Sequence, residues 1–164
     1  MFEIIALRRT GRAVSSVPAI LKAFALGRTC TLALKDEPFP YAVTVSYVPC
    51  FCENELFLII HGSREGRKAT LLGREPCLAL TVTLQDRVNM TGDCRSSNCY
   101  QSLCAEALAE ELHGLAALEG LTELMYHHGA VGERSELQKR LAPLADRTAV
   151  WRLKILRAAL KRHA

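Results

Sequence analysis

Short β-type segments separated by tight turns fill the first half of this chain and restrict it to few folds. β-Branched and aromatic residues dominate 41–48, and apolar residues dominate 56–60 and 78–84. The sequences at 36–40 and 53–54 are turn-forming and leave only hairpin-length connections between strands. Consecutive strands joined this way predict a closed antiparallel barrel with helices at its periphery.

Helical spacing appears in four places, one before these strands and three between or after them. Ser16 is a good N-cap, Pro18 suits a first turn, and Gly27 suits a helix end. We predict a polar, irregular loop over 87–98, and we leave 99–108 open between strand and helix. The remaining expected helices are 66–74, 112–128 and 133–144, and the remaining expected strands are 30–34 and 149–155.

The segment 57–72 has the composition of an anion site. Apolar residues run into His61-Gly62, and a second glycine precedes Arg67 and Lys68 at the start of a short helical pattern. Glycines let the backbone approach a ligand, and helix N-termini with adjacent cations favour phosphate. The alternative is a strand, a loop and a solvated basic helix start.

Charge and composition exclude several classes of protein. The chain has 164 residues and a net charge of +4, which suits one domain of ordinary size and is too weak a charge to indicate nucleic acid binding. The basic clusters near Arg8 and Arg162 are expected to be solvated tails. No stretch resembles a signal peptide or a membrane span, so we expect a cytoplasmic protein without membrane contact.

Seven cysteines are many for a chain of this kind. We expect reduced thiols, with Cys30, Cys77 and Cys104 packed as small apolar residues. Cys-x-Cys at 50–52 and Cys-x4-Cys at 94–99 lack the spacing of common zinc knuckles, so no metal site is predicted.

In several segments the chain resembles the flavin-binding split-barrel superfamily, the pyridoxamine-phosphate-oxidase-like proteins. Within it, the nearest branch is that of the nitroimidazole-resistance proteins. The resemblance covers about residues 8–156 of a single domain spanning 1–164, and it includes a His-Gly-x-x-x-Gly-x-Lys turn. The matching segments are 40–47 (PYAVTVSY), 56–62 (LFLIIHG), 65–72 (EGRKATLL), 76–82 (PCLALTV) and 99–103 (CYQSL).

The resemblance implies a mainly β fold, a six-stranded antiparallel split barrel. It implies a homodimer with FMN sites at the interface. The strand from Val43 to Ser46 would lie along the flavin ring, and Ile60, His61 and Gly62 at a strand end would flank it. Arg67 and Lys68 would hold the phosphate. Gln101 and Ser102 would approach across the interface. His61 would also be a proton donor or substrate contact. The implied FMN-binding residues are Val43, Thr44, Val45, Ser46, Ile60, His61, Gly62, Arg67, Lys68, Gln101 and Ser102.

The resemblance further implies an FMN-dependent oxidoreductase that takes electrons from a nicotinamide and reduces a small acceptor, such as a nitroaromatic. No G-x-G-x-x-G fingerprint is present, so the nicotinamide would dock transiently. The alternative is a non-catalytic flavin- or haem-binding protein that uses His61 or His113. Three departures stand out: Thr44 replaces a frequent proline, no glycine follows Ser102, and a Thr-Gly-Lys-like end is missing.

Overall fold

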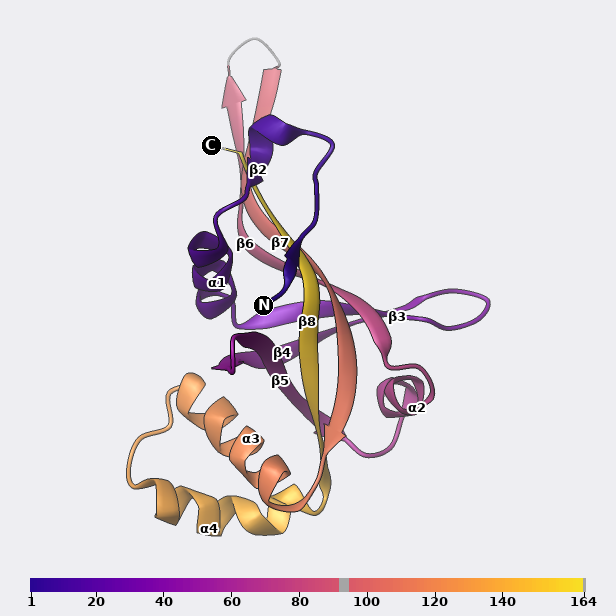
Figure 1. Ribbon diagram of the computed structural model, residues 1–164, viewed down its shortest axis with the longest axis vertical. Coiled ribbons are helices and arrows are strands. Elements are labelled where there is room, and N and C mark those ends of the chain that lie inside the picture. The colour runs from indigo at the N-terminus through magenta and orange to yellow at the C-terminus, as the bar shows by residue number, and fades with distance from the viewer. Residues whose placement is uncertain (92–94, 164) are drawn as a thin grey trace.

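The computed structural model describes residues 1–91 and 95–163 (Figure 1). Within these residues, the long strands are β3 (Thr29–Leu34), β4 (Tyr41–Cys52), β5 (Glu55–Ser63), β6 (Cys77–Thr91), β7 (Arg95–Leu112) and β8 (Thr148–His163). The short strands are β1 (Glu3–Ile4) and β2 (Ala13–Val14). The helices are the 3-10 turn η1 (Thr10–Arg12), α1 (Val17–Leu26), α2 (Arg67–Arg74), α3 (Gly114–His127) and α4 (Arg134–Ala145).

The long strands close into a barrel. Their order is β8-β5-β4-β3-β6-β7, and β7 pairs again with β8, every pairing being antiparallel. Closure pairs most of these strands on both edges, with an exception at the start of β4. The predicted six-stranded antiparallel barrel is therefore confirmed.

Two apolar cores hold the fold. The barrel interior contains the inward-facing residues of all six strands and the buried face of α1. The second core lies outside the barrel, between α3, α4 and the outer faces of β4, β5 and β8. Its buried members are Val48, Ile59, Ala117, Leu121, Leu124, Leu137, Leu141, Ala145 and Val150. One face of the β4–β5–β8 sheet is thus covered by the helical pair, as Figure 1 shows.

Local signals fix the ends of α1 and the β4–β5 turn as predicted. The backbone N–H of Ala19 donates to Ser16 Oγ at 3.4 Å, and Gly27 is the C-cap. Glu53 and Asn54 have φ values of 50° and 65°, the left-handed pair that a two-residue hairpin turn requires. These turns set the register of the strands that they join.

The loop predicted over 87–98 is wrong where the structure describes it. β6 and β7 continue as a paired hairpin arm through this stretch, and the segment left open at 99–108 is strand. The polar side chains of this stretch gave no sign of a strand. Its strand structure comes from backbone hydrogen bonds between β6 and β7. Residues 92–94, including Cys94, lie outside the described residues.

The C-terminal cations are not a solvated tail. β8 extends to His163, so Arg157, Lys161 and Arg162 lie in a barrel strand that pairs with β7. β1 pairs with β8 in parallel orientation and β2 pairs with it in antiparallel orientation. The N-terminal segment thus lies along the edge of β8 beyond the last pair with β5, at Lys154. The sequence prediction failed here because alternation of apolar residues breaks at a bulge, where the register shifts between Glu106 and Ala107.

Gly27 permits a close approach between α1 and the barrel. A Cβ there would lie against the Tyr47 hydroxyl and 2.6 Å from Val82 Cγ1. The same hydroxyl donates to the Phe24 carbonyl at 2.7 Å inside the core. We expect Gly27→Ala to lower the free energy of unfolding by about 1–3 kcal/mol through overpacking, measured by urea denaturation.

Gly73 in α2 supplies the matched control, because no heavy atom lies within 4 Å of its added Cβ. Gly73→Ala should leave stability unchanged or raise it by up to about 1 kcal/mol, since alanine favours helix. Equal destabilisation by both substitutions would contradict the packing argument.

Candidate functional site

The barrel is split between the first half of β4 and the end of β5. Tyr47–Cys52 pairs with β5, but among the described residues no ladder joins 41–46 to β5. The last residues of β5, His61 to Ser63, are paired only along their other edge, with β8, which β5 already contacts from Phe57 onward. One backbone edge of 41–46 is therefore open. Its outward-directed N–H and C=O groups are available to a ligand.

Lys68, in the first turn of α2, places its ammonium at this split. Its Nζ donates to the His61 carbonyl at 3.0 Å, and no described carboxylate forms an ion pair with it. A Cβ on Gly62 would collide with this ammonium, so the glycine makes room for it. Desolvation lowers the pKa of Lys68. A half-buried cation whose partner is a single carbonyl suits an anionic group.

The thiol of Cys30 lies beside this lysine. Burial raises the pKa of Cys30 to about 12, with Lys68 opposing the shift. The thiol therefore stays protonated at neutral pH and contributes no counter-charge. The sequence did not predict that Cys30 lies near Lys68. Cys30 reaches the site because β3 pairs with β4, where Cys30 lies opposite Val45.

Arg67, the other predicted phosphate ligand, points elsewhere. Its Nε donates to Asp36 Oδ2 at 2.7 Å, and its guanidinium lies 4.7 Å from the centroid of the Tyr41 ring. The hydrogen bond from Arg67 lowers the pKa of Asp36. Arg74 approaches the same carboxylate at 3.6 Å. The two adjacent cations thus diverge: Arg67 is held by Asp36 and Tyr41, and Lys68 turns to the His61 carbonyl.

The other predicted flavin-binding residues of β4 and β5 differ in whether the side chain or only the backbone is accessible to a ligand. Val43 and Val45 pack against the barrel core, and Ile60 is fully buried in it, so they present backbone rather than side chain to a ligand. Thr44 faces outward, and its hydroxyl lies 3.0 Å from that of Thr31. Ser46 is half-buried.

His61 is exposed at the end of β5. Desolvation lowers the pKa of His61, and the charges of Lys68 and His128 lower it further. The imidazole is therefore neutral at pH 7. The nearness of His128, at the end of α3, was not predictable from sequence spacing.

The low pKa of His61 predicts a stability effect at acidic pH. As the pH falls through the ordinary histidine pKa of 6.5, His61 takes up a proton in the unfolded chain before it does so in the folded chain. Stability therefore falls as the pH falls. We expect the melting temperature to drop less between pH 7 and pH 5 in His61→Gln than in the wild type. Parallel curves for the two proteins would refute the assignment.

Gln101 and Ser102 do not join this cluster within one chain. They lie in β7, which is separated from β4 by β3 and β6. In register, Thr44 of β4 lies opposite Thr31, Thr31 opposite Thr81, and Thr81 opposite Cys104 of β7. Three strand spacings separate the two groups by roughly 15 Å.

The cysteines fall into three environments. Cys30 is buried as expected, but Cys77 and Cys104 are exposed, because their side chains point away from the barrel. Cys50 is half-buried and Cys52 exposed on β4. Among the described residues no three His, Cys, Asp or Glu side chains gather as a metal site.

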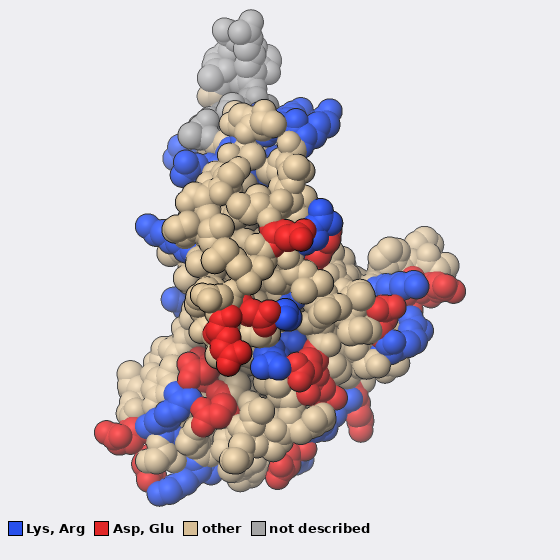
Figure 2. All heavy atoms as spheres, in the orientation of Figure 1, with Lys and Arg blue, Asp and Glu red and all other residues tan. Residues whose placement is uncertain are grey.

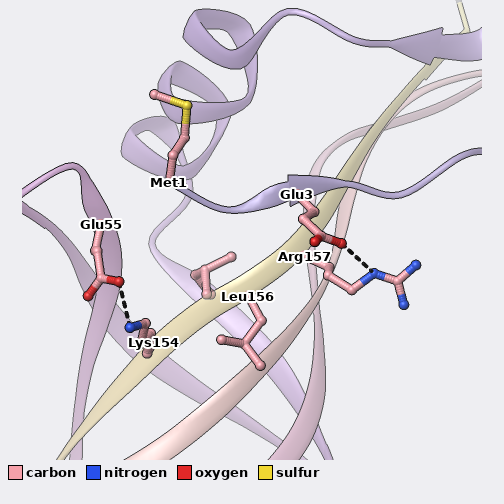
Figure 3. Close-up of a pocket in the computed structure, with 7 residues that line it drawn as sticks. Met1, Glu3, Glu55, Lys154, Leu156 and Arg157 are labelled. Atoms are coloured by element: carbon pink, nitrogen blue, oxygen red, sulfur yellow. Dashed lines mark ion pairs between the residues drawn. The ribbon is translucent and has the colours of Figure 1, made fainter.

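A hollow away from the split has a volume of about 340 Å³ and is lined by residues of the N-terminus, β5 and β8. Figure 3 shows how these residues lie. Ion pairs bound it on two sides: Glu55 with Lys154, and Glu3 with Arg157 at 3.8 Å. Since both cations already have carboxylate partners, this hollow is a poorer site for an anionic cofactor than the split.

Comparison with known proteins agrees with this architecture. A family model described as pyridoxamine 5'-phosphate oxidase matches residues 16–162. No curated protein matches the chain. No described helix is long and apolar enough to cross a membrane.

Solved structures share the fold at low identity. A candidate 5-nitroimidazole antibiotic resistance protein from Bacteroides thetaiotaomicron is 19% identical with a TM-score of 0.72, covering 91% of this chain and 85% of its own. An FAD and haem binding protein from Mycobacterium smegmatis is 19% identical with a TM-score of 0.67, covering 92% and 73%. A haem storage protein from Vibrio cholerae is 15% identical with a TM-score of 0.55, covering 89% and 94%. The barrel and the match along most of its length identify this chain as a member of the pyridoxamine 5'-phosphate oxidase family.

Proposed function

We propose that this protein is an FMN-dependent oxidoreductase whose flavin binds at the split between β4 and β5. The observation that carries the proposal is the half-buried ammonium of Lys68 beside an open strand edge. Relatives described as flavin-binding, such as the FAD and haem binding protein, support a flavin as ligand.

The residues at the split fit FMN. Lys68 would hold the phosphate, and the open edge of 41–46 would bond the polar edge of the ring. Gly62 leaves room for the Lys68 ammonium at the split, because a Cβ there would collide with Nζ. When bound, the flavin would accept electrons from a nicotinamide and pass them to a small acceptor.

The side chains of the protein would position the flavin and the acceptor. His61, neutral at pH 7, would donate or accept a hydrogen bond at the ring or the acceptor. Lys68 supplies an ammonium whose partner at the split is the His61 carbonyl. No stronger acid or base is required, since the cofactor performs the redox chemistry.

A homodimer would complete the site. Small uncharged side chains gather on the outer face of β3, β4, β6 and the part of β7 around Ser102 and Cys104, bordered on β7 by Glu106. They are here called the neutral face: Thr29, Thr31, Ala33, Ala42, Thr44, Ala79, Thr81, Thr83, Ser102 and Cys104. The outer face of β8, by contrast, carries ion pairs. Interface cores are depleted in charge. A second copy seated on the neutral face would bring Gln101 and Ser102 across to the flavin.

Nitroaromatic compounds are the proposed acceptor class. The support is the description of the Bacteroides structure, whose fold this chain shares. The nicotinamide would dock over the flavin, because the chain has no dinucleotide fingerprint.

Stopped-flow absorbance tests the activity directly. The FMN-loaded protein is mixed anaerobically with NADH or NADPH, and then with a nitroimidazole. We expect the flavin band to bleach and then to return on addition of the acceptor. If the bound flavin is not reduced by either nicotinamide, the oxidoreductase proposal fails. The non-catalytic flavin- or haem-binding alternative would then replace it.

A further inference from the structure

Two cations converge on Tyr100 near the base of the β6–β7 arm. Arg12 Nη1 donates to the Tyr100 hydroxyl at 3.2 Å, and Arg12 Cζ lies 5.8 Å from the ring centroid. Lys161 Nζ lies 5.1 Å from the same centroid. Backbone pairing fixes this meeting: Ala13, next to Arg12, pairs with Lys161, and Tyr100 pairs with His163. The cluster therefore joins η1, β2, β7 and β8.

The charge of this cluster is unbalanced, unlike that of the first three cations of β8. Arg152, Lys154 and Arg157 each form an ion pair with a glutamate. Within the described chain, neither Arg12 nor Lys161 forms any ion pair. Two adjacent half-buried cations repel each other and favour an anion between them.

The phenol of Tyr100 is a weak substitute for that anion. Desolvation raises the pKa of Tyr100, but hydrogen bonding and charge from Arg12 and Lys161 outweigh it and lower the pKa. The acid nearest in register is Asp86, opposite Tyr100 on β6, which is exposed and pairs with neither cation. The ring of His163 lies 6.0 Å from that of Tyr100.

More positive charge surrounds the cluster. Arg8 and Arg9 precede η1, and Arg162 follows Lys161; all three are exposed. Figure 2 shows Lys and Arg side chains on both sides of the arm's base, with few acidic side chains between them. Such a field attracts anions and raises their local concentration.

We propose that Arg12, Lys161 and Tyr100 form a second anion site, for the phosphate or pyrophosphate group of a small ligand. Arginine and lysine together supply directed hydrogen bonds and a point charge to phosphoryl oxygens. Within one chain the site is separate from the split, because Lys161 pairs with Ser102, which lies three strands from Thr44. The observations that carry it, the contacts of two cations with Tyr100, are independent of the flavin proposal.

Isothermal titration calorimetry with inorganic pyrophosphate tests the site. The double variant Arg12→Gln/Lys161→Gln is compared with Lys139→Gln/Arg140→Gln on exposed positions of α4, which removes the same charge. We expect the first to bind pyrophosphate about tenfold or more weakly than the wild type, and the control to change by about twofold at most. Equal losses in the two variants, or no binding by the wild type, would overturn the proposal.

Two further measurements separate this site from the split. Lys68→Ala should leave pyrophosphate binding intact; loss of binding there would place the anion at the split instead. Pyrophosphate should also raise the pKa of Tyr100, because the cations would turn from the phenol to the anion. Absorbance titration near 295 nm reports this shift, and Tyr100→Phe identifies the titrating step. An unchanged titration with pyrophosphate bound would contradict the role of Tyr100.

Discussion

Lys68→Ala is expected to weaken FMN binding by about 30- to 150-fold, since losing a hydrogen-bonded charge partner costs about 2–3 kcal/mol. The physical reason is its position: the ammonium is half-buried at the split, and its partner is the His61 carbonyl. Fluorescence titration of FMN into the protein without cofactor measures the effect, because bound flavin is quenched.

Arg67→Ala provides the sharpest comparison, since the two residues are adjacent and both cationic. Arg67 is held by Asp36 and Tyr41, so its removal should cost at most about 1 kcal/mol. The double variant should then resemble Lys68→Ala. Lys139→Ala, on α4 and exposed, controls for net charge. A larger loss from Arg67→Ala than from Lys68→Ala would reverse the assignment.

Thr81→Arg should convert the proposed dimer to a monomer and abolish most FMN binding. Thr81 lies in the central row of the neutral face, between Thr31 and Cys104. An unpaired arginine buried there costs on the order of 3 kcal/mol or more in each subunit. Light scattering after size-exclusion chromatography at micromolar concentration measures the change of mass.

Two other variants serve as controls for this test. The Thr81 hydroxyl donates to the Leu103 carbonyl at 2.9 Å, so the substitution also removes an internal hydrogen bond. Ala33→Arg changes the same face without that loss, since the residues opposite it are Ala42 and Ala79, and it should give the same result. Ser135→Arg on α4 adds the same charge at an exposed position away from the neutral face and should change nothing. A wild-type protein that is monomeric at this concentration would eliminate the interface model.

The barrel was predictable because its local signals agree. The turn at Glu53 and Asn54, the alternation in the strands and the cap at Ser16 each specify one structure. The hairpin arm and the long β8 were missed, because their strand character comes from pairing with neighbours rather than from their own residues.

The candidate site was only partly predictable. Sequence order placed Gly62 and Lys68 together, because a tight turn joins the strand and helix that carry them. It could not show that Arg67 turns to Asp36, which lies 31 residues away, or that the β4–β5 ladder stops at Tyr47. Such features depend on contacts distant in sequence, which no local pattern encodes.

The most direct test of a flavin at the split is the visible spectrum of the freshly purified protein, followed by release and identification of whatever absorbs. The account predicts a two-banded flavin spectrum and released FMN, with that spectrum lost in Lys68→Ala and kept in Lys139→Ala. A sharp Soret band would point to haem instead. A colourless protein that also fails to take up added FMN would contradict the central claim.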